Sequence, residues 1–544
     1  MRRPHARNQV DSNTTDQQKM DPSIKLHSRT ISTRSTKFKC AKSKLVIIIT
    51  LIALLSCYYL FKSKTKSFSK MYGIIIDGGS TGTRIHVLRY RIESGGKVVF
   101  DFEEGTMKVN PGLSAYAGDP EGAGRSVEEL VEFGKGRVPR ELWGETEVRL
   151  MATAGMRLLD SEARDRILDV CRRVLKKSGF KFQDSWASVI TGSDEGLYAW
   201  VVANYALGTL GGDPLETTGI IELGGASAQV AFVSTEPVPP EFSRTVEFGN
   251  ITYNIYSHSF LNLGQNAAFE ALRESLVSGN HHPGKYAVPF ISAESLGKGI
   301  FVDPCTPKGY SRVVESLKLS PGSLTEKNRF VSTLHSRGNF SECRSAALTL
   351  LQKGKEICSY QHCQIGSVFI PKLQGKFLAM ENFFYTSKFF GLGQRAFLSN
   401  LVIAGEHFCG EDWSMLKKKH HSLKDEDLVH YCFSSAYIVA LLHDSLGIAF
   451  DDPRIEFASQ VGNIPLDWAL GAFILHTNVA LDMEHSDWIA TIISDDSPTL
   501  LSLIGFAILM MVIAWSVSKW RKPQLKTVYD LEKGRYIVTR VGKS

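Results

Sequence analysis

Two segments of the chain share one pattern that strongly constrains its fold. Residues 72–88 read YGIIIDGGSTGTRIHVL, and residues 219–233 read GIIELGGASAQVAFV. Each begins as an apolar strand, ends that strand in a carboxylate (Asp77 or Glu222), turns through glycine and hydroxyl residues, and continues as a second strand. The repetition predicts two related α/β lobes, each contributing one loop to a shared cleft.

Both turns carry the groups that proteins use to bind phosphate. Glycines let backbone N–H groups approach phosphate oxygens, and serine or threonine hydroxyls add donors. A carboxylate at each strand end can hold a divalent cation, directly or through water. Neither turn is a Walker loop, because no GK[ST] follows and the next element is a strand. Either loop alone is more typical of a plain turn, but the pair predicts a phosphate-plus-metal site.

Glu195 is the candidate general base. It follows a predicted strand at 186–190 and a Thr-Gly turn, in a segment whose apolar residues recur every three or four positions. Ser193 is the expected N-cap, which places Glu195 in the first turn, where the helix dipole favours an ionised carboxylate. Most first-turn glutamates only stabilise their helix. Its place shortly before the second loop nevertheless favours a role in activating water.

Other catalytic classes find little support in the sequence. The histidines are scattered, and neither a Gly-x-Ser-x-Gly elbow nor a Cys/His nucleophile pair is present. The aromatic run at 383–390 is more typical of a core than of a binding face. A nucleobase would need such a stacking surface, however, and Tyr385 is the candidate.

Two apolar runs, 45–61 and 499–518, predict membrane helices. The alternatives are a cleaved signal for the first and a buried core helix for the second. Acidic residues precede the second run and basic residues follow it, so the C-terminal tail should be cytosolic. With two spans both tails are cytosolic, and residues 71–498 are lumenal or extracellular. The short first span favours a thin internal membrane such as the Golgi over the plasma membrane.

The charge distribution agrees with this division. The ends are basic (+8 over 1–44, +4 over 45–70 and +6 over 519–544), which leaves −11 for the region between them. Basic tails can face anionic lipid, whereas an acidic domain argues against nucleic-acid binding. A polyanionic substrate should therefore arrive with a metal ion. Residues 1–44 are polar and basic with little to bury, which predicts disorder.

The cysteines and sequons fit an oxidising compartment. Six cysteines lie in the later half of the middle region without zinc-ligand spacing, which favours disulfides over free thiols. Six cysteines allow 15 pairings; the nearest-neighbour pattern is 305–343, 358–363 and 409–432. Cys171, in a helical stretch, is expected to be a buried free thiol. Asn250 and Asn339 are the predicted glycosylation sites.

Five motifs taken together resemble one family. IIIDGGSTGTRIHV, MATAGMRLL, TGSDEGLYAWVVANY, IIELGGASAQVAF and NIPLDWALGA, in this order, resemble the nucleoside-triphosphate diphosphohydrolase (apyrase) family. The segments YSHSFLNLGQNAA and YCFSSAYIVALLH and the two-span arrangement are similar to membrane-bound plant apyrases. The resemblance implies an actin/hexokinase/Hsp70-like α/β fold of two ribonuclease-H-like lobes around a central cleft. It divides the chain into lobe I (71–191, with 456–485 returning to it) and lobe II (192–455).

The resemblance also implies an activity, namely Ca²⁺- or Mg²⁺-dependent release of terminal phosphate from nucleoside tri- and diphosphates. It assigns roles to residues that match the family motifs. Catalysis falls to Glu195 as base, with Ser227 and Gln229 holding the water. Phosphate binding falls to Ser80, Thr81, Gly82, Thr83, Thr153, Gly224, Gly225 and Ala226. The metal falls to Asp77 and Glu222, through water, with Trp468 near its ligand shell.

One departure from the family pattern bears on this expectation. The family usually has Asp where this chain has Glu222, and the extra methylene moves the carboxylate by roughly a bond length, enough to matter for catalytic positioning. Two alternatives therefore stay open. One is a phosphotransferase or polyphosphatase on the same scaffold, and the other is an inactive nucleotide-binding membrane protein.

Overall fold

The computed structural model describes most of the chain between residues 71 and 477. The described residues are 71–92, 98–101, 105–278, 300–319, 327–360, 363–477, 505–506, 508–513, 515–516, 525–530 and 534–540. The predicted tail (1–44) and first span (45–61) lie outside them, and only short helical pieces of the second span lie inside. Within the described ranges, no helix combines the length and apolar character needed to cross a membrane.

The first sheet has six strands in the order β3-β2-β1-β5-β6, with β4 paired to β2. Its strands are β1 (Met71–Gly78), β2 (Thr83–Ile92), β3 (Val98–Asp101), β4 (Thr106–Val109), β5 (Glu147–Ala152) and β6 (Ala187–Val189). β1 pairs antiparallel with β2 and parallel with β5. The isoleucine-rich β1 is central in this sheet, which explains why it lacks the alternation of a half-exposed strand.

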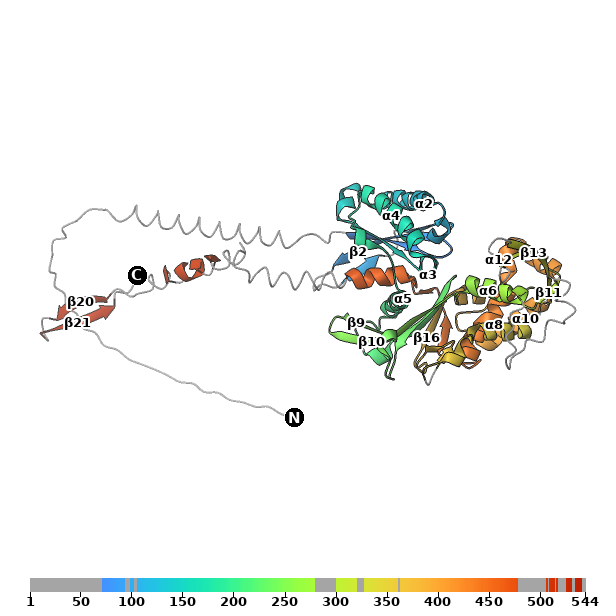
Figure 1. Cartoon of the computed structure of the whole chain (residues 1–544). Helices are drawn as coiled ribbons and strands as arrows, with labels where there is room; N and C mark the ends of the chain where they lie inside the picture. The colour runs from blue at the N-terminus through green and yellow to red at the C-terminus, as the bar shows by residue number, and fades with distance from the viewer. Residues whose placement is uncertain are drawn as a thin grey trace, which may run out of the picture. The chain divides into compact units, whose positions relative to one another are not determined.

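Helices α2 (Pro120–Lys135) and α4 (Ser161–Lys177) cover one face of the first sheet (Figure 1). Both begin at an aspartate N-cap, Asp119 and Asp160, whose side chains accept backbone N–H bonds. Cys171 lies fully buried on α4 and is a free thiol, as predicted. The short helix α3 (Ala154–Arg157) follows β5 directly.

The second sheet also has six strands, in the order β17-β16-β7-β8-β10-β9. Its strands are β7 (Gly219–Leu223), β8 (Ser227–Val233), β9 (Ser243–Phe248), β10 (Ile251–Leu261), β16 (Phe377–Glu381) and β17 (Ile455–Phe457). One face packs on α5 (Gly192–Leu207). The other packs on a helical layer made of α6 (Gln265–Ser278), α8 (Phe340–Leu351), α9 (Asn382–Phe389), α10 (Leu398–Gly410) and α13 (His430–Val439).

The two sheets repeat one topology. In each, a strand–loop–strand hairpin (β1–β2 or β7–β8) is followed by a third antiparallel strand on one side and two parallel strands on the other. A helix then follows the last parallel strand, namely α5 in one case and residues 468–477 in the other. The repeat predicted from the two loop motifs is therefore a repeat of whole sheets, and the predicted mixed α/β class is confirmed.

One hydrophobic cluster joins the two sheets. It contains Ile75 from β1, Ile220 from β7 and residues of both repeated helices, such as Trp200 and Ala469. Backbones approach closely here: a Cβ on Gly471 would lie 1.8 Å from the Tyr198 carbonyl oxygen. Asp77 lies two residues after Ile75, and Glu222 lies two residues after Ile220. Residues two apart on a strand share one face of the sheet, so both carboxylates lie on the faces that this cluster packs together.

Further strands and helices belong to the described part of the chain. They are β11 (Ile300–Asp303), β12 (Ser311–Leu319), β13 (Lys327–Ser336), β14 (Cys363–Ile365), β15 (Val368–Phe369), α11 (Trp413–Lys419), α12 (Asp425–Leu428), a π-helical segment (Ala440–Ser445), β18 (Gln460–Val461), β19 (Ile464–Pro465), and a C-terminal hairpin of β20 (Leu525–Asp530) and β21 (Arg535–Arg540). All three predicted disulfides form, joining Cys305 to Cys343, Cys358 to Cys363 and Cys409 to Cys432.

One local expectation was wrong. The N-cap of α5 is Thr191 rather than Ser193, because the Thr191 hydroxyl accepts the Asp194 N–H at 3.1 Å. The helix therefore begins two residues earlier than predicted. Glu195 still lies in its first turn, and the Ser193 carbonyl instead accepts a hydrogen bond from Ser257.

Candidate active site

The two loops and the predicted base line one cleft. Residues predicted for the site that line it are Asp77, Ser80, Thr81, Gly82, Thr153, Glu195, Glu222, Gly224, Gly225, Ala226, Ser227 and Trp468. They come from both sheets and both repeated helices. The sequence therefore identified most of the lining of a single cleft.

The two glycine loops face each other at close range. A Cβ on Gly225, in the second loop, would lie 2.9 Å from Ser80 Oγ and 2.9 Å from Thr81 Cγ2 of the first loop. Real Cβ atoms do not tolerate such contacts without a shift, so glycine allows the second loop to approach the first. Gly82 allows the first loop to approach β4, because its Cβ would lie 2.9 Å from the Val109 carbonyl oxygen.

Asp77 and Glu222 both present an unsatisfied oxygen at this cleft. Neither Asp77 Oδ1 nor Glu222 Oε2 has a hydrogen-bond partner, although both atoms are buried. Burial raises the pKa of Asp77 well above its usual value, and the nearby Asp467 raises it further. Burial also raises the pKa of Glu222, as do Glu195 and Glu381. Buried carboxylates without partners are costly, which favours a positively charged ligand between them.

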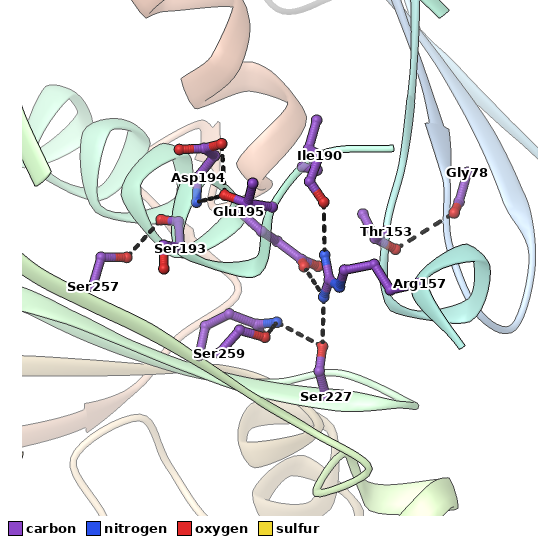
Figure 2. Close-up of polar contacts among 12 residues, drawn as sticks. Gly78, Thr153, Arg157, Ile190, Ser193, Asp194, Glu195, Ser227, Ser257 and Ser259 are labelled. Atoms are coloured by element: carbon purple, nitrogen blue, oxygen red, sulfur yellow. Dashed lines mark hydrogen bonds and ion pairs between the residues drawn. The ribbon is translucent and has the colours of Figure 1, made fainter. Parts of the chain in front are cut away.

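Glu195 is held by Arg157 (Figure 2). The Arg157 Nη2 donates to Glu195 Oε2 at 2.8 Å, and both side chains are largely buried. Arg157 also donates to the Ile190 carbonyl at 3.2 Å, which ties α3 to the end of β6. Burial raises the pKa of Glu195, while the charge of Arg157 and hydrogen bonds from Arg157 and Gln229 lower it. The guanidinium thus opposes the protonation that burial favours.

Ser227 and Gln229 form the next layer beside Glu195. Gln229 Nε2 donates to Ser227 Oγ at 2.6 Å and to Ser259 Oγ at 3.1 Å. Ser227 Oγ also accepts a longer bond from Arg157, at 3.4 Å. Ser227 lines the cleft, whereas Gln229 lies behind it. A hydroxyl and an amide joined by a hydrogen bond therefore lie beside Glu195, and the hydroxyl belongs to a residue that lines the cleft.

Besides Gln229, two predicted site residues do not line the cleft. Thr83 begins β2, where it pairs with Gly78 and Val109, and it is fully buried. Tyr385 lies on α9 and is 48% exposed, outside the residues that line the cleft. Burial and the charge of Glu381 raise the pKa of Tyr385. The neighbouring Phe383 is buried in the core.

The charged residues at one side of the cleft were missed by sequence reasoning. Arg84 Nη1 donates to Asp467 Oδ2 at 2.9 Å, and His86 Nε2 lies 3.5 Å from the same oxygen. Burial alone would raise the pKa of Asp467, but His86 and Arg84 hold it below its ordinary value. Lys108 and Glu381 complete this side. Arg84 and Asp467 lay inside quoted motifs, but nothing in their spacing showed that they pair.

The cleft fits a divalent cation that keeps much of its own water. The orphaned oxygens of Asp77 and Glu222 are hard donors of the kind that Ca²⁺ and Mg²⁺ prefer. Among the described residues, however, no three acidic, histidine or cysteine side chains lie close enough to enclose a bare ion. The residues therefore fit a cation whose remaining ligands are water and phosphate, as is usual for Mg²⁺.

Comparisons with known proteins agree with this geometry. Residues 63–486 match the GDA1/CD39 (nucleoside phosphatase) family. "Probable apyrase 6" of Arabidopsis thaliana is 57% identical, over 99% of this chain and all of that protein. "Ectonucleoside triphosphate diphosphohydrolase 1" of Mus musculus is 31% identical, over 81% of this chain and 88% of that protein.

A solved structure supports the fold. The nucleoside triphosphate hydrolase structure from Neospora caninum has a TM-score of 0.56 at 17% identity, and the match covers 80% of this chain and 97% of that one. Sequence and structure together lead to one conclusion: the chain belongs to the GDA1/CD39 (nucleoside phosphatase) family.

Proposed function

We propose that the chain is an apyrase, which releases the terminal phosphate of nucleoside tri- and/or diphosphates with the help of Ca²⁺ or Mg²⁺. The observation that carries the proposal is that two facing glycine loops and a buried, arginine-paired Glu195 line one cleft. The family membership and the apyrase names of the relatives support the same activity.

In the proposed reaction the loops bind the phosphates and Glu195 activates water. Backbone N–H groups of both loops, with the hydroxyls of Ser80 and Thr81, hold the terminal and penultimate phosphates. Glu195 accepts a proton from water as the water attacks the terminal phosphorus in line. The bond from that phosphorus to the bridging oxygen breaks, and the nucleotide leaves one phosphate shorter. Ser227, held by Gln229, orients that water. Positioning and charge stabilisation supply most of the acceleration.

Asp77 and Glu222 would hold the cation, through its water ligands, and Trp468 lies in the same cleft beside Asp467. When bound, such an ion screens the phosphate charges and stabilises charge that develops during transfer. Trp468 is almost fully buried and stacks on Tyr198 with ring centroids 6.3 Å apart. This packing would hold the cleft wall in place whether or not an ion is bound.

The size of the cleft supports a nucleoside that lies toward its mouth. The space between the lining residues measures about 110 Å³, well below the 300–1,000 Å³ or so of a site that encloses a whole small ligand. It accommodates phosphate groups with a hydrated ion. The base would then extend past Glu381 toward the half-exposed Tyr385, on which it could stack.

We also propose the topology expected from the sequence. The two sheets would be the cores of ribonuclease-H-like lobes (71–191 with 456–485, and 192–455). Membrane helices at 45–61 and 499–518 would place this domain in the lumen of the Golgi or another internal membrane, or outside the cell, with both tails cytosolic. Three disulfides support an oxidising compartment. Asn250 is exposed, as a glycan acceptor must be; Asn339 is half-buried and caps α8.

The test is phosphate release by the purified full-length chain. ATP, ADP, GDP, UDP and polyphosphate are supplied with Ca²⁺, Mg²⁺ or chelator, with and without a sugar acceptor. The proposal expects phosphate from nucleotides that stops on chelation. Phosphate transferred to the acceptor would instead indicate a phosphotransferase, and release from polyphosphate alone a polyphosphatase. Nucleotide binding without release would indicate an inactive binding protein.

A further inference from the structure

Glu381 is a cleft residue with an unusual backbone. It ends β16 with φ 58° and ψ −119°, a combination that side chains disfavour and glycine tolerates. Non-glycine residues held in such a conformation cluster at functional sites. A glutamate at a position suited to glycine suggests that its carboxylate is used.

The same backbone conformation directs the side chain toward the cleft. Along β16, Leu378 and Met380 face the cluster between the sheets, whereas Ala379 faces the helical layer behind the second sheet. Regular alternation would turn residue 381 toward that apolar layer. Instead the chain breaks its extended geometry at Glu381, and the side chain lines the cleft.

The repeated topology gives this position a counterpart beside the first loop. In the first sheet Asp77 pairs with Met151, and Gly78 with Ala152. In the second, Glu222 pairs with Met380, and Leu223 with Glu381. Glu381 therefore corresponds to Ala152, and the next residue, Asn382, corresponds to Thr153. The second half of the cleft has a carboxylate where the first has a methyl group.

Charge counting shows what this carboxylate adds. Glu195 pairs with Arg157, and Asp467 pairs with Arg84. In the part of the chain that the structure describes, Asp77, Glu222 and Glu381 make no hydrogen bond or ion pair with a cationic side chain, although all three line the cleft. Lys108 is the remaining cation in the lining. With a cation bound and all three carboxylates ionised, these groups and one lysine sum to two negative charges, the complement of one divalent cation.

We propose that Glu381 is a third carboxylate of the cation site, acting with Asp77 and Glu222 through the water bound to the ion. The inference rests on the proposed function, since that function requires the ion. It also bears on Glu222, whose side chain is longer than the aspartate usual in apyrases. Glu222 on β7 and Glu381 on the neighbouring strand β16 would then act together. Two adjacent strands of one sheet would hold the hydrated ion.

The test measures cation binding directly. CaCl₂ or MgCl₂ is titrated by calorimetry into the full-length chain, alone and with adenosine 5′-methylenediphosphonate. Glu381→Gln should weaken cation affinity about 10- to 100-fold, as removal of a supporting ligand usually does. Glu456→Gln is the matched control. Glu456 lies on β17, beside β16, and its partner is the surface residue Arg395, so its loss should leave the affinity unchanged.

Glu381→Gly separates the effect of the carboxylate on cation binding from its effect on the stability of the fold. Glycine adopts this backbone conformation without strain, so the variant should melt at or above the wild-type temperature without cation, yet lose affinity as Glu381→Gln does. A lower melting temperature together with unchanged affinity in Glu381→Gln would mean that Glu381 only supports the fold or an ionic contact with Lys108. Either Gln or Gly variant with wild-type affinity refutes the proposal.

The outcome separates this inference from the proposed function. If the wild-type chain releases phosphate from nucleotides but Glu381→Gln binds cation normally, the role of Glu381 is refuted and the apyrase assignment stands. If the wild-type chain releases no phosphate but Glu381→Gln still loses cation affinity, the apyrase assignment fails and the cation role stands.

Discussion

Removing Arg157 should shift the pH dependence of the reaction. Arg157 donates at 2.8 Å to the buried Glu195 and lowers a pKa that burial raises. Without the guanidinium the pKa of Glu195 rises further, so a larger fraction of the base is protonated at neutral pH. Because general-base catalysis needs the ionised form, Arg157→Met should lose activity at pH 7 and regain part of it as the pH is raised.

The structure sets the size of this effect. Charge-assisted hydrogen bonds contribute about 1.5–3 kcal/mol, and about 1.4 kcal/mol corresponds to a factor of ten. The proton affinity of Glu195 should therefore rise about 10- to 150-fold, and the acid limb of the kcat/KM profile should move to higher pH by the corresponding amount. Arg157→Lys keeps the charge but loses the hydrogen bonds to Ile190 and Ser227. Its activity should therefore lie between those of the wild type and Arg157→Met.

The assay is a kcat/KM profile from pH 5 to 10 on the full-length chain with saturating Mg²⁺. Arg244→Met is the control, because Arg244 pairs with the neighbouring Asp194 at 3.4 Å in a more exposed setting. That variant should keep the wild-type profile. A loss in Arg157→Met that is equal at every pH would refute the reasoning, since it would show that Arg157 does not act through protonation of Glu195.

Two further predictions follow from the cleft. Gly225→Ala should lower phosphate release at least tenfold with little change in melting temperature, because its Cβ meets Ser80 and Thr81 at 2.9 Å and forces the loops apart. Gly144→Ala is the control, because a Cβ there would meet nothing within 4 Å, and equal activity of the two variants would contradict the steric argument. Burial raises the pKa of Glu222 well above 4.5, so the folded, cation-free chain holds a proton that the unfolded chain releases. Stability should then fall as pH rises from about that ordinary value through the raised pKa, by up to about 1.4 kcal/mol per pH unit for one proton. Glu222→Gln should flatten this slope in thermal melts, and an unchanged slope would show that Glu222 is not protonated in the fold.

Local patterns in the sequence predicted the parts of the site that local chemistry determines. The strand–loop–strand motifs carry their own turn chemistry, and Glu195 is positioned by the first turn of α5, so both could be identified without coordinates. The disulfide pairs join cysteines near in sequence, and the pairing by proximity was right. The burial of Cys171 followed from helical periodicity.

The residues that were missed are those placed by contacts distant in sequence. Arg84 and Asp467 are 383 positions apart, and their pairing depends on how residues 468–477 return to the first sheet. The orientation of Glu381 depends on one backbone dihedral at the end of β16. Thr83 was assigned to the phosphate loop from its motif. In the structure it is instead the first residue of β2, so the loop ends at Gly82.

The most direct test of the account is the rate of phosphate release by Glu195→Gln. The account predicts a loss of about 10²- to 10⁴-fold, the usual contribution of a general base, while cation binding, nucleotide binding and the melting profile of the full-length chain stay close to wild type. A Glu195→Gln variant that retained most of the wild-type rate would contradict the central claim, because water would then be activated by another group.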